Sequence, residues 1–217
     1  IERVRSWLER FDGGELDAFW MAWQQLTLEP TSSRYGAELL MQPDLSVYPV
    51  WQQSDEALKA RILAAGREYL GLAQPKPADW LGTPTWPLSE MCVFPVLYTL
   101  RELDGEAFAA LESSVWAKWA HVCVSYSATS ASGMTDERVP AQIVAKAYQE
   151  APAEFLAALD VIKAQEASRD RGHVFVVRKL ERAWDDQLEA HVLGWLSEGE
   201  PQPAAVASCL EAILERR

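Results

Sequence analysis

The residue types that form metal sites occur in this sequence without the spacing that a metal site requires. His121 and Cys123 come closest to a ligand pair, but side chains two positions apart on a helix point in different directions and do not share one ion. His173 and His191 have no ligand-type residue at i+3 or i+4. We therefore predict no metal site and no cofactor.

Catalytic motifs are missing in the same way. The sequence contains neither the G-x-x-x-x-G-K-[ST] nor the G-x-G-x-x-G phosphate-binding pattern, and no G-x-S-x-G nucleophile turn. Asp185 and Asp186 are neighbouring carboxylates that an acid–base mechanism can use. They directly precede the apolar positions of an expected helix, where acidic side chains satisfy free amides. We predict that this pair caps the helix, that no residue is catalytic and that the chain is not an enzyme.

One short segment combines basic and aromatic side chains in a way typical of binding surfaces. Arg178, Lys179 and Arg182 precede Trp184, just before the acidic helix start. Arginine and tryptophan often anchor protein interfaces. The plainer interpretation, which we favour on the residues alone, is a solvated basic face with Trp184 in the core. Arg178, Lys179, Arg182 and Trp184 are therefore our candidate partner-binding residues, with that alternative open.

Most of the chain shows the apolar spacing of amphipathic helices. Val206, Cys209, Leu210 and Ile213 repeat at i, i+3, i+4 and i+7, which places them on one side of a helix. For Val174–Val177, a strand is the alternative to the helix that we favour. We expect helices over 1–9, 15–27, 54–70 with Ser54 as N-cap, 88–103 with a kink at Pro95, 106–113 and 115–124, a short one near 36–41, and others beginning near Pro140, Pro152, His173, Asp186 and Pro203.

Breaker residues and a weak repeat indicate how these helices are organised. The stretch 72–87 contains four prolines and one glycine, which makes it the strongest loop prediction in the chain. The polar stretch 125–133 is a second predicted loop. The helices around Leu58, Phe108, Phe155 and Val206 are 50, 47 and 51 residues apart, near the period of paired-helix repeats. We predict an all-α, HEAT-like α-solenoid of stacked helical hairpins, as a single helical-repeat domain over 1–217 with a sub-block boundary near 72–87.

Composition limits the partners and the compartment. The net charge of −12 disfavours nucleic-acid binding, which depends mainly on cations. Three widely spaced cysteines favour a reducing compartment. No stretch of the given sequence resembles a signal peptide, and the longest apolar run, 91–100, is about half of the roughly 20 residues that a membrane span requires. We expect a cytoplasmic protein without a membrane partner and, since it begins at Ile1, a piece of a longer chain.

The last third of the chain resembles a region of large bacterial NACHT-type P-loop NTPases. The matching stretches lie within Ala147–Leu214: AYQEAPAEFLAALDVIKAQE, GHVFVVRKLERAWDDQLEAHVL and the helix ending in LEAIL. The resemblance implies a HEAT-like solenoid that follows the nucleotide-binding module and senses or binds a partner, in proteins of antiphage or stress response. The NTPase itself is missing here, so no catalytic residue carries over. The partner is then a protein or the remainder of the parent chain, and the rival hypothesis is a small helical hydrolase with a pocket between helices.

Overall fold

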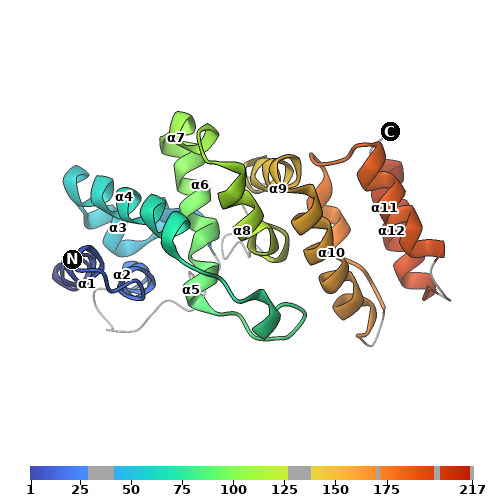
Figure 1. The fold of residues 1–217 in the computed structure, drawn as a ribbon, viewed down its shortest axis with the longest axis horizontal. Coiled ribbons are helices and arrows are strands. Elements are labelled where there is room, and N and C mark those ends of the chain that lie inside the picture. Colours follow the sequence, from blue (N-terminus) through green and yellow to red (C-terminus); the bar gives the residue numbers. More distant parts are fainter. Residues whose placement is uncertain (29–41, 127–137, 170–171, 198–200, 216–217) are drawn as a thin grey trace. The chain divides into compact units, whose positions relative to one another are not determined.

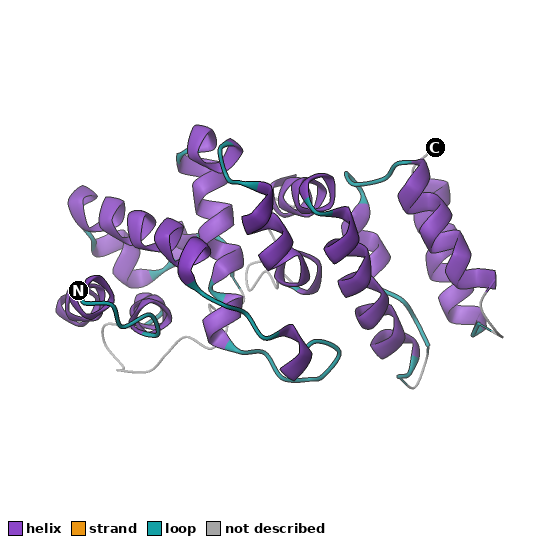
Figure 2. Cartoon of the chain, in the orientation of Figure 1, coloured by secondary structure: helices purple, strands orange, loops and turns teal. Residues whose placement is uncertain are grey.

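The computed structural model describes residues 1–28, 42–126, 138–169, 172–197 and 201–215, and the fold within these ranges is all-α (Figures 1 and 2). The all-α prediction is confirmed. The chain divides into two compact units. The first contains Ile1–Pro75, Trp86–Val115 and Tyr126. The second contains Lys76–Thr85, Trp116–Ser125 and the described residues from Arg138 onward. The predicted loop 72–87 is therefore where the chain leaves the first unit and returns to it.

The first unit opens with the predicted helical hairpin. Helix α1 (Glu2–Asp12) packs against α2 (Ala18–Leu26), and the rings of Phe11 and Phe19 lie 5.8 Å apart between them. Gly14, with φ +92°, makes the turn in a conformation that side-chain-bearing residues rarely adopt. The expected short helix near 36–41 lies outside the described residues.

In the first unit, α4 (Glu56–Leu72) packs against both helices of the hairpin and against α6 (Val93–Leu103). Gly66 permits this contact, because a Cβ there would lie 3.0 Å from the Val96 side chain. In place of the kink predicted at Pro95, the helix predicted over 88–103 is interrupted at Cys92, three residues earlier, and forms two helices. A proline ring clashes with the carbonyl four residues before it, here that of Met91. The other elements of this unit are η2 (Leu45–Val47), α3 (Pro49–Gln53), α5 (Leu88–Met91) and α7 (Gly105–Ala109).

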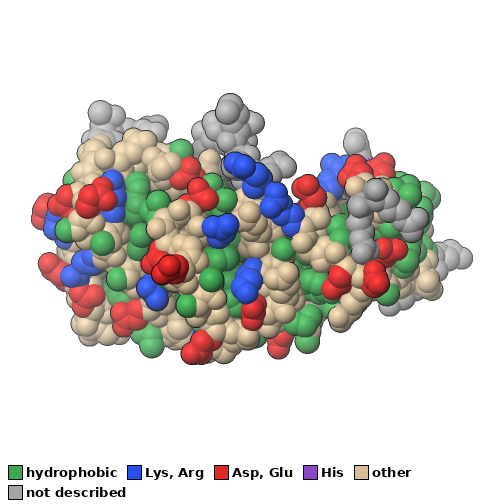
Figure 3. Space-filling view, turned by 90° about the horizontal axis from the view of Figure 1, so that it is seen from above, with side chains coloured by type: hydrophobic (Ala, Val, Ile, Leu, Met, Phe, Trp, Pro, Cys, Tyr) green, Lys and Arg blue, Asp and Glu red, His purple; other side chains and the backbone are tan. Residues whose placement is uncertain are grey.

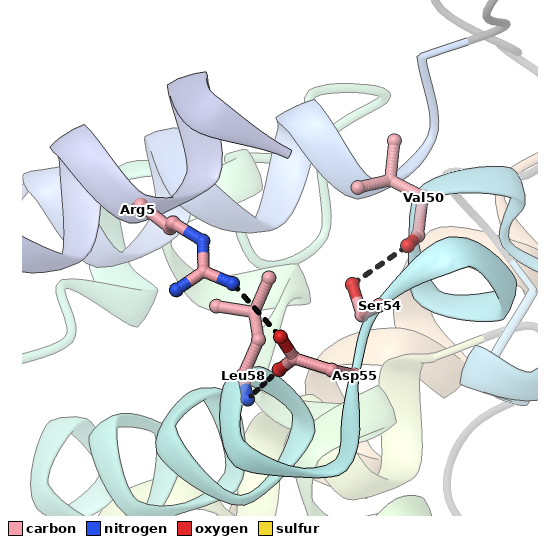
Figure 4. Close-up of polar contacts among 5 residues, drawn as sticks. All are labelled: Arg5, Val50, Ser54, Asp55 and Leu58. Atoms are coloured by element: carbon pink, nitrogen blue, oxygen red, sulfur yellow. Dashed lines mark hydrogen bonds and ion pairs between the residues drawn. The ribbon is translucent and has the colours of Figure 1, made fainter.

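Helix α4 begins one residue later than the sequence predicts, and its N-cap is Asp55 (Figure 4). The Asp55 carboxylate accepts a hydrogen bond from the Leu58 amide at 2.7 Å and another from Arg5 Nη2 at 3.0 Å. Ser54, the predicted cap, instead donates to the Val50 carbonyl at 2.7 Å, at the end of α3. The assignment to Ser54 was wrong because this hydroxyl serves the preceding helix.

We expect Asp55→Ala to lower the thermal midpoint of unfolding, and Ser54→Ala to lower it less. The Leu58 amide holds the pKa of Asp55 below its ordinary value, helped by Arg5. A lowered folded pKa stabilises the chain above the unfolded pKa, and this contribution is lost as pH falls through the folded value. The effect of Asp55→Ala, measured by circular dichroism, should therefore shrink at acid pH. An equal effect at pH 7 and pH 2 would contradict the capping role.

The second unit follows the predicted helix order closely. Helix α8 (Ser113–Ser125) supplies Trp116–Ser125, and α9 (Arg138–Glu150) packs against α10 (Pro152–Ala167). Helices α11 (Asp186–Ser197) and α12 (Pro203–Glu215) lie side by side (Figure 1). Pro152 and Pro203 each occupy the first helical position, as predicted. Apart from these helices, the loop 76–85 contains only a short 3₁₀ turn, η3 (Pro77–Asp79).

The segment after Gly172 differs from the prediction. The helix expected from His173 is absent, and a 3₁₀ helix, η4 (Val176–Leu180), takes its place. The strand alternative is also wrong. Val176, Val177 and Leu180 are buried as the apolar face predicts, and the Val176 amide donates to Glu166 of α10 at 2.9 Å. This bond ties the start of η4 to a neighbouring helix, and η4 also packs on α9 and α12.

Candidate functional site

A cleft of about 650 Å³ lies between η4, with the turn that follows it, and helix α12. The two walls of the cleft are held next to each other because η4 packs against α12. Two of the four predicted partner-binding residues, Arg178 and Trp184, line the cleft. The described residues that line it are Val177, Arg178, Glu181, Trp184, Ser208, Glu211, Ala212 and Glu215.

Trp184 and Arg178 supply the aromatic and basic surfaces of this cleft. The Trp184 side chain is half-buried. Arg178 is exposed, its guanidinium lies 5.8 Å from the Phe175 ring centre, and its Nη2 is 3.9 Å from a Glu211 carboxylate oxygen. Both side chains of this ion pair are about two-thirds exposed (67% and 65%). Such an open pair contributes little to stability, so Arg178 and Glu211 are available to a partner.

The other two predicted residues are placed differently. Lys179 is half-buried, and its ammonium donates to the carbonyls of Val124 and Ser125 at 3.1 and 3.0 Å. It therefore binds the last carbonyls of α8, where a cation also complements the helix dipole. Burial lowers the pKa of Lys179 to about 8, against a smaller upward effect of Glu166. Arg182 is exposed and is not among the residues that line the cleft.

A second group of polar side chains, which sequence reasoning missed, connects α10 to α11. One oxygen of Asp160 accepts from Trp195 Nε1 at 2.7 Å and lies 2.8 Å from His191 Nε2. The Lys163 ammonium is 5.5 Å from the Trp195 ring centre. These residues border a pocket of about 420 Å³. The carboxylate partner of His191 is 31 residues earlier, on α10, and the Trp195 ring of its own helix lies 5.5 Å from the imidazole ring.

This polar group resembles part of a catalytic arrangement, since a carboxylate can hold a histidine in one tautomer. A hydrolase also needs a nucleophile or an activated water in reach of that histidine. The residues that line the pocket, apart from those named above, are Ala164, Ala190 and Gly194. The group therefore supplies an orienting pair, and no Ser, Thr or Cys is among the described residues that line the pocket.

The cysteines are buried and unpaired. Burial raises the pKa of Cys123 to about 12 and that of Cys209 to about 11, and it raises the pKa of Cys92 further. A thiol with a raised pKa is a poor nucleophile and a poor metal ligand. Among the described residues, no group of three or more histidine, cysteine or acidic side chains is arranged to hold a metal ion.

The exposed charges are mixed on the face that Figure 3 presents, where acidic and basic side chains alternate with apolar ones. No helix within the described ranges has the length and apolar content to cross a membrane. No protein-family model, curated protein or solved structure matches this chain.

Proposed function

We propose that this chain is a non-catalytic recognition module that binds a protein partner through the cleft between η4 and α12. The observation that carries the proposal is the placement of a half-buried tryptophan and an exposed arginine, Trp184 and Arg178, in one cleft. These residue types dominate the binding energy of protein interfaces. The wider role, as a HEAT-like sensor region of a bacterial NTPase in antiphage or stress response, is supported by the resemblance of Ala147–Leu214.

The residues that line the Trp184 cleft and the His191 pocket favour a recognition function over the rival hydrolase. The pocket with His191 and Asp160 has no Ser, Thr or Cys among its described lining residues, and one Asp160 oxygen already contacts two neighbours. The cleft with Trp184 has both an aromatic wall and charged groups of both signs. We also infer that the paired helices α1–α2, α9–α10 and α11–α12 are repeats of a solenoid, because stacked helical hairpins expose extended surfaces for binding.

Photocrosslinking tests the proposal. A benzoylphenylalanine placed at Glu181, an exposed residue of the cleft, is expected to crosslink one protein when the parent chain is expressed in its own cells. The same group at Leu72, 55% exposed in the first unit, is the position control. Trp184→Ala should reduce the adduct at least about tenfold, the effect of losing an interface anchor, whereas Trp86→Ala, at an exposed tryptophan of the first unit, should not. An adduct that persists in Trp184→Ala would overturn the proposal.

A further inference from the structure

The charges around the cleft are unbalanced. Among the described residues, three carboxylates line it, those of Glu181, Glu211 and Glu215, and one guanidinium, that of Arg178. All four side chains belong to exposed residues. The walls therefore carry an excess of negative charge beside the half-buried ring of Trp184.

The α12 wall concentrates this negative charge. Glu211 and Glu215 are four residues apart on one helix, so their carboxylates are neighbours and repel each other. They also lie in the last turns of α12, where the helix dipole is negative, and the described part of that turn has no basic residue. A cation from outside would relieve both unfavourable interactions.

The Trp184 wall selects the kind of cation. The face of an indole ring attracts an ammonium or guanidinium group, and its apolar surface accepts the aliphatic stem of a lysine or arginine. A small inorganic cation makes no use of such a surface. A cleft of about 650 Å³ is also within the size range of sites that enclose a side chain and its flanking backbone.

We propose that the occupant of this cleft is a basic segment of a protein partner, whose lysine or arginine side chain lies on Trp184 and whose charge meets Glu211 and Glu215. The inference rests on the proposed function, because it names the chemistry of the partner bound at the same site. In this arrangement the incoming cation competes for Glu211 with Arg178, whose Nη2 lies 3.9 Å from the Glu211 carboxylate. The interaction is electrostatic and weakens with salt.

Peptide selection with the full chain tests the inference. A random peptide library displayed on phage is selected on the wild-type chain and depleted on Trp184→Ala. We expect the selected peptides to be enriched in lysine or arginine next to apolar residues. In fluorescence anisotropy, acetylation of that lysine, or citrulline in place of the arginine, should weaken binding at least about tenfold. The double variant Glu211→Gln/Glu215→Gln should weaken it similarly, whereas Glu68→Gln, at an exposed glutamate of the first unit, should leave it unchanged.

The other outcomes separate this inference from the function on which it rests. Peptides that depend on Trp184 but are acidic or purely apolar would overturn the basic partner and leave the recognition cleft standing. A library that yields no Trp184-dependent peptide would contradict both. Arg216 and Arg217 follow Glu215 directly and lie outside the described residues. Tighter peptide binding after both are replaced by Gln would overturn the inference by making the chain's own arginines the occupant.

Discussion

We expect the difference in unfolding free energy between the wild-type chain and a Lys179→Met variant to change by up to about 3 kcal/mol, in favour of the wild type, as the pH rises from 8 to 10.5. The folded chain binds the Lys179 proton only up to about pH 8, whereas the unfolded chain binds it up to about 10.5. Between these values the unfolded state holds more protons, so a rise in pH favours the folded state. Each unit of pKa difference corresponds to about 1.4 kcal/mol.

The two hydrogen bonds of Lys179 persist when its ammonium loses a proton, because the neutral amine is still a donor. After it loses its proton, Lys179 can still donate to the carbonyls of Val124 and Ser125. The cost of burying the charge disappears, and it is larger than the favourable interaction of that charge with Glu166, which is lost as well. Methionine matches the aliphatic stem but cannot donate, so the variant leaves both carbonyls without this donor and has no titration at the position.

The difference between the two proteins is the quantity to measure, by urea unfolding at a series of pH values. The buried cysteines act in the opposite direction, because their thiols ionise more easily in the unfolded chain than at the raised folded pKa values. That effect is common to both proteins and cancels in the comparison. Lys118→Met, on α8, is the control for the removal of a lysine at another position. A wild-type-minus-Lys179→Met difference that stays constant from pH 7 to 10.5 would contradict the burial of this ammonium.

The role of Lys179 also shows where sequence reasoning reached its limit. As one charge in the run Arg178–Arg182, Lys179 has the same local sequence signal as its neighbours. Its burial depends on the C-terminus of α8, more than 50 residues earlier. The prediction grouped the basic residues with Trp184 because they lie close together in the sequence. Local periodicity does not contain that information.

Helix positions were predicted well where one side of the helix is buried. Leu188, Val192 and Trp195 on α11 are buried, because a 3.6-residue period reflects one-sided burial. On the predicted face of α12, Cys209 and Ile213 are buried, whereas Leu210 is 41% exposed. Short elements were predicted poorly. Helix α3 has only five residues and the break at Cys92 depends on a clash one turn away, so neither leaves a periodic pattern. The Asp160–His191 contact was missed for a related reason, since it joins two helices.

The helix start at Asp185 supports the second large prediction, a loss of about 2–3 kcal/mol of unfolding free energy in Asp185→Ala. One Asp185 oxygen accepts from the Leu188 amide at 2.7 Å, and the Tyr148 hydroxyl donates to it at 2.9 Å. The capping interaction predicted from the sequence is thus present. Loss of an N-cap costs about 1 kcal/mol. The Tyr148 hydroxyl also loses its charged acceptor in a part-buried hydrogen bond, which costs about 1–2 kcal/mol more.

Two further variants separate these contributions. Asp185→Asn keeps an acceptor for both donors and should cost less than about 1 kcal/mol, since asparagine caps helices as well as aspartate. Asp186→Ala, in the first turn of α11, removes a neighbouring charge but not the cap, and it should cost no more than about 0.5 kcal/mol. Urea unfolding of the three variants at pH 7 gives the comparison.

The titration of Tyr148 provides a readout that a simple loss of helix would not produce. Burial raises the pKa of Tyr148 to about 12, with help from the hydrogen bond to Asp185 and from its charge. In Asp185→Ala only the burial remains, so the absorbance titration of this tyrosine should move toward its ordinary value of 10. Since Tyr148 lies on α9 and Asp185 precedes α11, a double-mutant cycle with Tyr148→Phe should give a coupling of about 1 kcal/mol. A coupling near zero, together with an unshifted Tyr148, would mean that Asp185 acts only as the cap of its own helix.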